Sequence, residues 1–221
     1  MSGPIARDVL MAEWPVSSET VRRRLAPHVI DLGEDAWVAV LAGWLADHEA
    51  TADALVATLP LRVELLRIGA REVATPRRTS WHGDPGSTYA YSGRTFAPEA
   101  WTPELERIRD ALEATTGVRF GSVLVNEYRG GRDSMGWHAD DEPELGPRAP
   151  DDVLIASVSL GARRRFVMRH RRRPAEKREW ALGAGDLLVM GGATQRRWQH
   201  AVPKTAKPVG ARVNLTFRIV R

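Results

Sequence analysis

The sequence NEYRGGRDSMGWHADDE, residues 126–142, joins two pairs of polar side chains through a Gly-Gly turn. Asn126 and Tyr128 are two positions apart, and so are His138 and Asp140. Because residues two apart on an extended strand point to the same side, each pair predicts two polar groups on one face of a strand. An imidazole beside a carboxylate can hold a divalent transition metal, but two ligands make a weak site. A third ligand should therefore lie elsewhere in the chain.

Histidines elsewhere are the candidates for that third ligand. His170 lies in a strongly basic segment, where positive charge opposes the binding of a cation. His200 lies in a turn-to-strand setting, and with His138 and Asp140 it would complete a set of two histidines and one carboxylate. That set leaves three coordination positions open, as in non-haem Fe(II) oxygenases. The residues alone leave a second interpretation open, in which these side chains are structural and bind no metal. A His-x-Asp pair is common by chance, and a single histidine is more often structural than a ligand.

A second alternation occupies the sequence RVNLTFR, residues 212–218, in which apolar and polar side chains take turns. Its polar positions are Arg212, Asn214, Thr216 and Arg218. If this face is turned into a closed β-structure, two buried guanidinium groups need anions, and one dicarboxylate would satisfy both. A strand with a solvated polar face is the alternative.

The pattern of the whole chain predicts an α+β protein. Helices are expected at residues 34–48 and 52–59, and a third should begin at Thr102-Pro103 and end before Gly117. A strand at 61–68 should run into a turn. After Gly117, many short strands at close spacing predict a sandwich, barrel or jelly roll. The expected strands are 120–128, 153–160, 165–170, 179–182, 186–190, 197–202 and 212–220.

Composition narrows the function classes. The chain has 221 residues and no cysteine, which excludes disulfides, a cysteine nucleophile and thiolate metal sites and fits a reducing compartment. No signal peptide is visible, and the longest apolar run, 36–46, is too short for a bilayer, so we expect a cytoplasmic protein without membrane contact. The net charge is +4, and basic residues cluster between 163 and 178. Such a block is usually a solvated face, but it is also what a phosphate backbone selects.

From about Pro76 to its C-terminus, the chain resembles the AlkB family of Fe(II)- and 2-oxoglutarate-dependent nucleic-acid demethylases. The matching pieces occur in the family's order and spacing. They are Asn126-x-Tyr128, Trp137-His138-x-Asp140-Asp141-Glu142, IASVSLG at 155–161, GGATQ at 191–195, Trp198-x-His200 and RVNLTFR at 212–218.

The resemblance implies a C-terminal double-stranded β-helix, or jelly roll, at residues 118–221. Residues 1–117 would form an α/β extension and nucleotide-recognition lid within one continuous catalytic domain. Fe(II) would be held by His138, Asp140 and His200, and O2 would be a cosubstrate. Residues implied to surround 2-oxoglutarate are Asn126, Tyr128, Arg212, Asn214 and Arg218. Oxidation of an N-methyl carbon would release formaldehyde, succinate and CO2, without any catalytic nucleophile.

The substrate implied is alkylated DNA, and RNA as an additional substrate, with bases of the 1-methyladenine and 3-methylcytosine type. The base must leave the stack to reach the oxidant. We expect Tyr91 and Trp81 to hold it by stacking, with His138 opposite. Glu142, and Asp141 beside it, would face a cationic base, although a solvated acidic turn is the competing interpretation. Residues expected at the nucleic-acid backbone are Arg77, Arg78, Arg163, Arg164 and Arg165.

Several alternatives stay open at this point. The Ile68-Gly69 turn lies roughly where some relatives carry an apolar wedge, but its spacing to Pro76 differs and Arg67 and Arg71 surround it. The sequence therefore leaves open whether the nucleic-acid substrate is duplex or single-stranded. The main alternative function is a 2-oxoglutarate dioxygenase acting on a protein or a small molecule, and a nucleic-acid-binding module with a structural metal ranks third. We expect a monomer that repairs alkylation damage by direct reversal.

Overall fold

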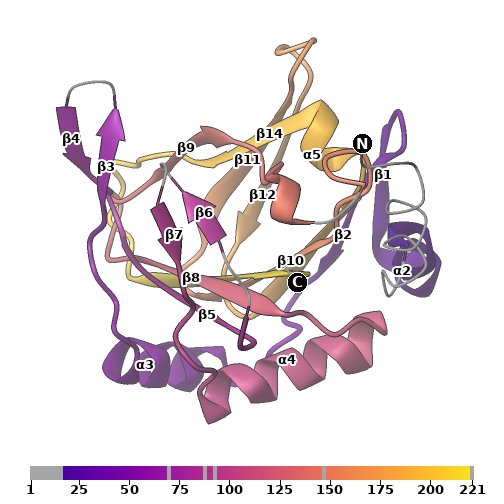
Figure 1. Cartoon of the computed structure of the whole chain (residues 1–221). Helices are drawn as coiled ribbons and strands as arrows, with labels where there is room; N and C mark the ends of the chain where they lie inside the picture. The colour runs from indigo at the N-terminus through magenta and orange to yellow at the C-terminus, as the bar shows by residue number, and fades with distance from the viewer. Residues whose placement is uncertain (1–16, 69–70, 87–88, 92–93, 146–147, 220–221) are drawn as a thin grey trace, which may run out of the picture.

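Two antiparallel sheets face each other in the computed structural model, which describes residues 17–219 except 69–70, 87–88, 92–93 and 146–147. For residues 66–68, 71, 89–91, 94–96 and 144, only the backbone is described. The seven-stranded sheet has the order β1-β2-β13-β10-β15-β8-β5, and the four-stranded sheet has the order β12-β11-β14-β9. Together they form the jelly roll that the sequence predicts (Figure 1).

The bounds of the elements are as follows. The large sheet contains β1 (Val29–Gly33), β2 (Ala36–Leu41), β5 (Arg78–Gly83), β8 (Ser122–Tyr128), β10 (Ile155–Gly161), β13 (Asp186–Gly192) and β15 (Arg212–Arg218). The small sheet contains β9 (Met135–His138), β11 (Arg164–His170), β12 (Lys177–Leu182) and β14 (Trp198–Val202). Two hairpins, β3 (Leu65–Ile68) with β4 (Arg71–Ala74) and β6 (Tyr89–Tyr91) with β7 (Arg94–Phe96), lie apart from both sheets. The helices are α2 (Ser18–Arg24), η1 (Ala26–His28), α3 (His48–Thr58), α4 (Pro103–Thr116), η2 (Pro143–Leu145) and α5 (Thr194–Arg197).

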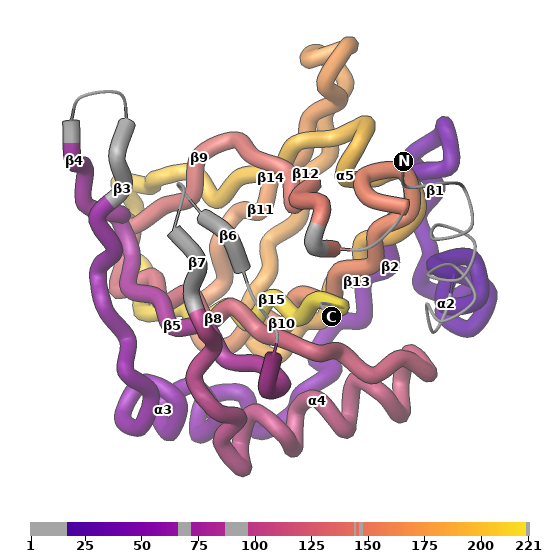
Figure 2. Tube along the Cα trace, viewed as in Figure 1, coloured from indigo at the N-terminus to yellow at the C-terminus, as the bar shows by residue number. Residues whose placement is uncertain are grey.

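Apolar side chains pack on both faces of the large sheet, although the inner face also carries polar residues that line a cavity. On its outer face, α3 and α4 run beneath the strands (Figure 1), and α4 buries Leu105, Ile108 and Leu112 in one core with residues of β8, β10 and β15. The predicted caps of α4 are confirmed, because the Thr102 hydroxyl accepts a hydrogen bond from the Leu105 N–H at 3.4 Å and Gly117 has a φ of 76°. A second core lies between the two sheets. The turn between β11 and β12 projects from the small sheet (Figure 2).

The helix predicted at residues 34–48 is wrong, because most of this segment forms strand β2 and the turn before it. Trp37 and Ala39 belong to the outer core, whereas Ala36 and Val38 belong to the core between the sheets. A strand covered on both faces loses the alternation of apolar and polar residues. Its continuous apolar run therefore resembled one face of a helix.

The boundary placed at residue 117 does not separate two structures. Strands β2 and β5 come from the front of the chain, yet β2 pairs with β13 and β5 pairs with β8. The front segment thus supplies β1, β2 and β5 to the same sheet that β8, β10, β13 and β15 form. Among the helices that the structure describes, none has both the length and the apolar character that a membrane crossing requires.

Candidate metal centre

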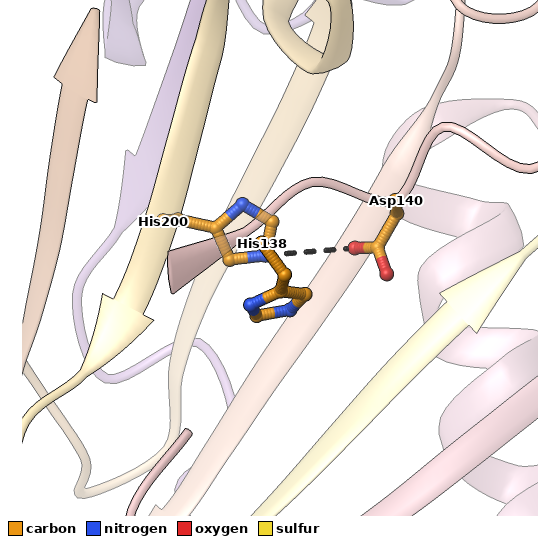
Figure 3. Close-up of side chains that lie close together, drawn as sticks. All are labelled: His138, Asp140 and His200. Atoms are coloured by element: carbon orange, nitrogen blue, oxygen red, sulfur yellow. Dashed lines mark ion pairs between the residues drawn. The ribbon is translucent and has the colours of Figure 1, made fainter. Parts of the chain in front are cut away.

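Three side chains from one end of the small sheet converge on a point (Figure 3). His138 ends β9 and lies directly opposite His200 of β14 in the strand register, and their ring centroids are 4.2 Å apart. Asp140 follows two residues after β9, and its Oδ2 atom lies 3.6 Å from Nε2 of His200. One ligand atom from each residue lies within 4.8 Å of the others. The three predicted ligands are therefore brought together.

The protonation states of these groups suit a divalent cation. Burial, together with the nearby His138, lowers the pKa of His200 to about 3, so its imidazole is neutral at physiological pH. Burial opposes ionisation of Asp140, but the charge of Arg218 holds the pKa of this carboxyl well below its usual value. Nδ1 of His138 lies 2.9 Å from the carbonyl oxygen of Gly136. If this nitrogen carries the proton, Nε2 is left to bind a metal. A neutral His200, the ionised Asp140 and a second imidazole from His138 fit Fe(II).

Asp140 is held by two residues from distant parts of the chain. Its backbone N–H donates to Oε1 of Gln195, which is fully buried, at 3.0 Å. Its Oδ1 atom accepts a hydrogen bond from Nη2 of Arg218. Because both contacts leave Oδ2 directed at His200, the carboxylate is fixed with one oxygen toward the metal position.

A cavity of about 540 Å³ extends from this centre between the two sheets. The polar face of β15 lines it, as the alternation predicts, and every residue of this strand is buried. Arg212 is 1% exposed, and its Nη2 atom donates to Ser159 at 2.7 Å and to Asn214 at 2.6 Å. Within the described part of the chain, Nε and Nη1 of Arg212 have no hydrogen-bond partner. A buried guanidinium with two unused donors needs an anion, so this end of the cavity fits a carboxylate of 2-oxoglutarate.

Asn126 and Tyr128 reach the same cavity from β8. In the register, Tyr128 lies opposite Arg212 and Asn126 lies opposite Asn214. Nε of Arg77 donates to Oδ1 of Asn126 at 2.6 Å. Arg77 was predicted to contact the nucleic-acid backbone, but it is buried, lines the cavity and contacts Asn126.

The residues predicted to hold the base fall into three groups. Trp81 and Glu142 line the cavity together with His138. Asp141 lies outside its lining, and its Oδ2 atom is 2.5 Å from Nη2 of Arg171. The side chain of Tyr91 lies outside the described residues, as does the Ile68-Gly69 turn. Of the predicted base contacts, the structure thus brings Trp81, Glu142 and His138 to one cavity.

The other predicted backbone arginines mostly face protein groups. Arg164 is 3% exposed and donates to the carbonyl oxygens of Gly130, Asp133 and Pro203. This is a correction to the prediction, because a buried guanidinium engaged by three backbone carbonyls cannot reach a phosphate. The remaining three arginines form ion pairs: Arg78 with Glu127, Arg163 with Asp186, and Arg165 with Glu179.

Two residues of the site were not predicted from the sequence. Gln195 stands in the matched GGATQ piece, but nothing in its neighbours indicates that it would support Asp140. Ser159 alternates with Ser157 in β10, and both hydroxyls lie within hydrogen-bond distance of Oδ1 of Asn214. The serine alternation in IASVSLG was a usable signal, because two polar residues on one face of an otherwise apolar strand indicate a polar lining.

Comparisons with known proteins agree with this geometry. The family described as the 2OG-Fe(II) oxygenase superfamily matches residues 38–218. The bovine protein named DNA oxidative demethylase ALKBH2 is 37% identical over 229 residues, covering 94% of this chain and 81% of that protein. The chain belongs to the AlkB family of 2OG-Fe(II) oxygenases. Fe(II), 2-oxoglutarate and O2 are what this family implies, and the site formed by His138, Asp140 and His200 fits the iron.

Two further AlkB relatives show how far the likeness extends. The mouse ALKBH2 protein is 44% identical over 152 residues, which cover 66% of this chain and 62% of that protein. The matched part therefore spans less than two thirds of that relative. A solved structure, OsALKBH1, superposes with a TM-score of 0.57 at 20% identity and covers 86% of this chain and 99% of that one. At that identity, the superposition supports the fold alone.

Proposed function

We propose that this AlkB-family oxygenase removes N-methyl groups from alkylated bases of DNA, of the 1-methyladenine and 3-methylcytosine type, by direct reversal. The observation that carries the proposal is that one cavity is lined by the ligand triad, the buried Arg212, Trp81 and Glu142. The names of the relatives, DNA oxidative demethylases, support the same chemistry. The products would be formaldehyde, succinate and CO2, and RNA would be a further substrate.

The residues that line the cavity would contribute to this reaction in different ways. When bound, Fe(II) with 2-oxoglutarate and O2 supplies an oxidant strong enough for a C–H bond. Arg212 binds a carboxylate of the cosubstrate, and Ser159 and Asn214 fix the guanidinium that does so. The enclosing strands of both sheets exclude bulk water from the reacting carbon.

The other end of the cavity would receive the base, which must first leave its stack. Trp81 and His138 offer flat rings to a flat heterocycle. Glu142 lines the same cavity, and its carboxylate would attract the positive charge of a methylated base and so favour it over its neutral parent. We further propose that the protein works in the cytoplasm, since the absence of cysteine fits a reducing compartment. The monomer expected from the sequence stays a prediction.

The test is a panel of methylated oligonucleotides, single- and double-stranded, with formaldehyde as the measured product. Asp140→Ala should abolish formaldehyde release because it removes a metal ligand, and it should leave oligonucleotide binding largely intact. His138→Ala should also abolish release. Near-normal turnover by either variant would show that the metal assignment is wrong. Succinate formation by the wild-type protein without formaldehyde from any oligonucleotide would favour a protein or small-molecule substrate.

A further inference from the structure

The outer face of the small sheet carries a row of side chains that the metal centre does not use. In the register, Lys177 of β12 lies opposite Arg169 of β11, and Arg169 lies opposite Gln199 of β14. Successive residues of a strand point to opposite faces. Because His138 and His200 point into the cavity, the residues just before them, Trp137 and Gln199, point outward. We call Lys177, Arg169, Gln199 and Trp137 the outer row.

Trp137 is exposed to an unusual degree for its size. It is 38% exposed, and no other tryptophan that the structure describes is exposed. Cζ of Arg169 lies 4.3 Å from the centroid of its ring. Oε1 of Gln199 accepts hydrogen bonds from Nε of Arg169 at 3.2 Å and from Nη2 at 3.0 Å. The guanidinium is thus held over the ring, on the edge strand β9 of the small sheet.

The charges of the outer row also differ from those of the neighbouring arginines. On the same face of β11, Arg165 forms an ion pair with Glu179. Neither Arg169 nor Lys177 has a carboxylate partner among the residues with described side chains. A flat exposed ring next to uncompensated cations matches single-stranded nucleic acid, whose bases stack on aromatic rings while its phosphates meet cations.

We propose that the outer row binds a single-stranded segment of the substrate nucleic acid that runs outside the catalytic cavity. A base would stack on Trp137, and the adjoining phosphates would meet Arg169 and Lys177. The row lies on the outer face of the sheet whose strands β9 and β14 carry His138 and His200 on the cavity side. This inference rests on the proposed function, since it assumes a nucleic-acid substrate, but it concerns a surface outside the catalytic cavity.

Binding of an unmethylated single-stranded oligonucleotide to the full chain tests the inference without turnover. Trp137→Leu should weaken affinity about 5- to 100-fold, the effect of losing one stacked base, and Trp137→Phe should retain most of the affinity. Arg169→Gln should reduce the slope of log affinity against log salt by about 0.7, the value for one phosphate contact on a single strand. Arg165→Gln is the matched control on the same face, and its slope should equal that of the wild type.

The outcomes separate the outer row from the proposed function. If Trp137→Leu and Arg169→Gln bind like the wild type while their melting temperatures fall, the row only stabilises the sheet edge, and the inference is overturned. Stronger binding of an acidic peptide than of the oligonucleotide would also overturn it. Formaldehyde release by the wild type is the separate readout, because its absence contradicts the proposed function whatever the outer row binds.

Discussion

Replacing Arg164 by methionine distinguishes a structural arginine from one that binds nucleic acid. Its Nη1 atom donates to the Gly130 carbonyl at 2.8 Å, and its Nη2 atom donates to those of Asp133 at 2.9 Å and Pro203 at 2.8 Å. These carbonyls belong to the loop before β9 and the segment after β14. Arg164 therefore ties together the segments that flank both histidine-bearing strands.

The expected cost follows from these contacts. Each hydrogen bond to a charged group contributes about 1.5–3 kcal/mol. Because methionine is uncharged, the variant avoids the free-energy cost of burying a guanidinium, and this offsets part of the lost hydrogen-bond energy. We expect Arg164→Met to lower the free energy of unfolding by about 3–5 kcal/mol, the range for removing one partner of a buried charged contact. In a chain of this size, that loss lowers the melting temperature by about 10 °C.

The neighbouring Arg165 provides the control. It is 60% exposed and its partner Glu179 is 50% exposed, so Arg165→Met should leave the melting temperature nearly unchanged. Thermal melts followed by circular dichroism, with oligonucleotide affinity measured at several salt concentrations, give the comparison. A wild-type melting temperature for Arg164→Met, together with a smaller salt slope, would show that this arginine faces a phosphate and that the structural reasoning is wrong.

Two more substitutions test the metal centre and the predicted cosubstrate contact. Gln195→Leu removes the acceptor of the Asp140 N–H. It should weaken Co(II) or Mn(II) binding about 10- to 100-fold, the usual effect of losing a residue that supports a metal ligand. Unchanged metal affinity would mean that Arg218 alone holds Asp140. Arg212→Gln should weaken 2-oxoglutarate binding at least about 30-fold in calorimetry, because it removes one charge of a buried charge pair. Wild-type cosubstrate affinity in that variant would remove Arg212 from the pocket.

Strand β15 shows what could be predicted from the sequence. Its period of two placed two arginines on a polar face, and two guanidinium groups on one face of a β-structure predicted an anion before any partner was known. In the structure, Arg212 and Arg218 both line the cavity, and the apolar residues of the other face lie in the outer core. The inward polar face follows from spacing alone, but the anion of Arg218 is Asp140 and not a shared dicarboxylate, so the contact of Arg212 with the cosubstrate stays a prediction.

The arginine-rich block shows where such reasoning ends. Counting positive charges predicted contact with phosphates, but the partners that engage these charges are remote in the sequence. Arg163 pairs with Asp186, and Arg164 reaches the carbonyl of Pro203. Charge composition contains no information on which guanidinium groups are already engaged. The structure therefore moves the candidate nucleic-acid contacts from Arg163–Arg165 toward Arg169 and Lys177.

The position of Asp140 could be predicted only in part from the sequence. The spacing argument placed it beside His138 on a strand, and the two residues do lie together, but β9 ends at His138 and no strand carries Asp140. Its position depends instead on Gln195, 55 residues away, and on Arg218, 78 residues away. A loop residue held by partners on α5 and β15 is correctly placed only when both sheets have closed around the cavity. The complete metal centre is thus a product of the whole fold, although two of its three ligands were visible as a local pair.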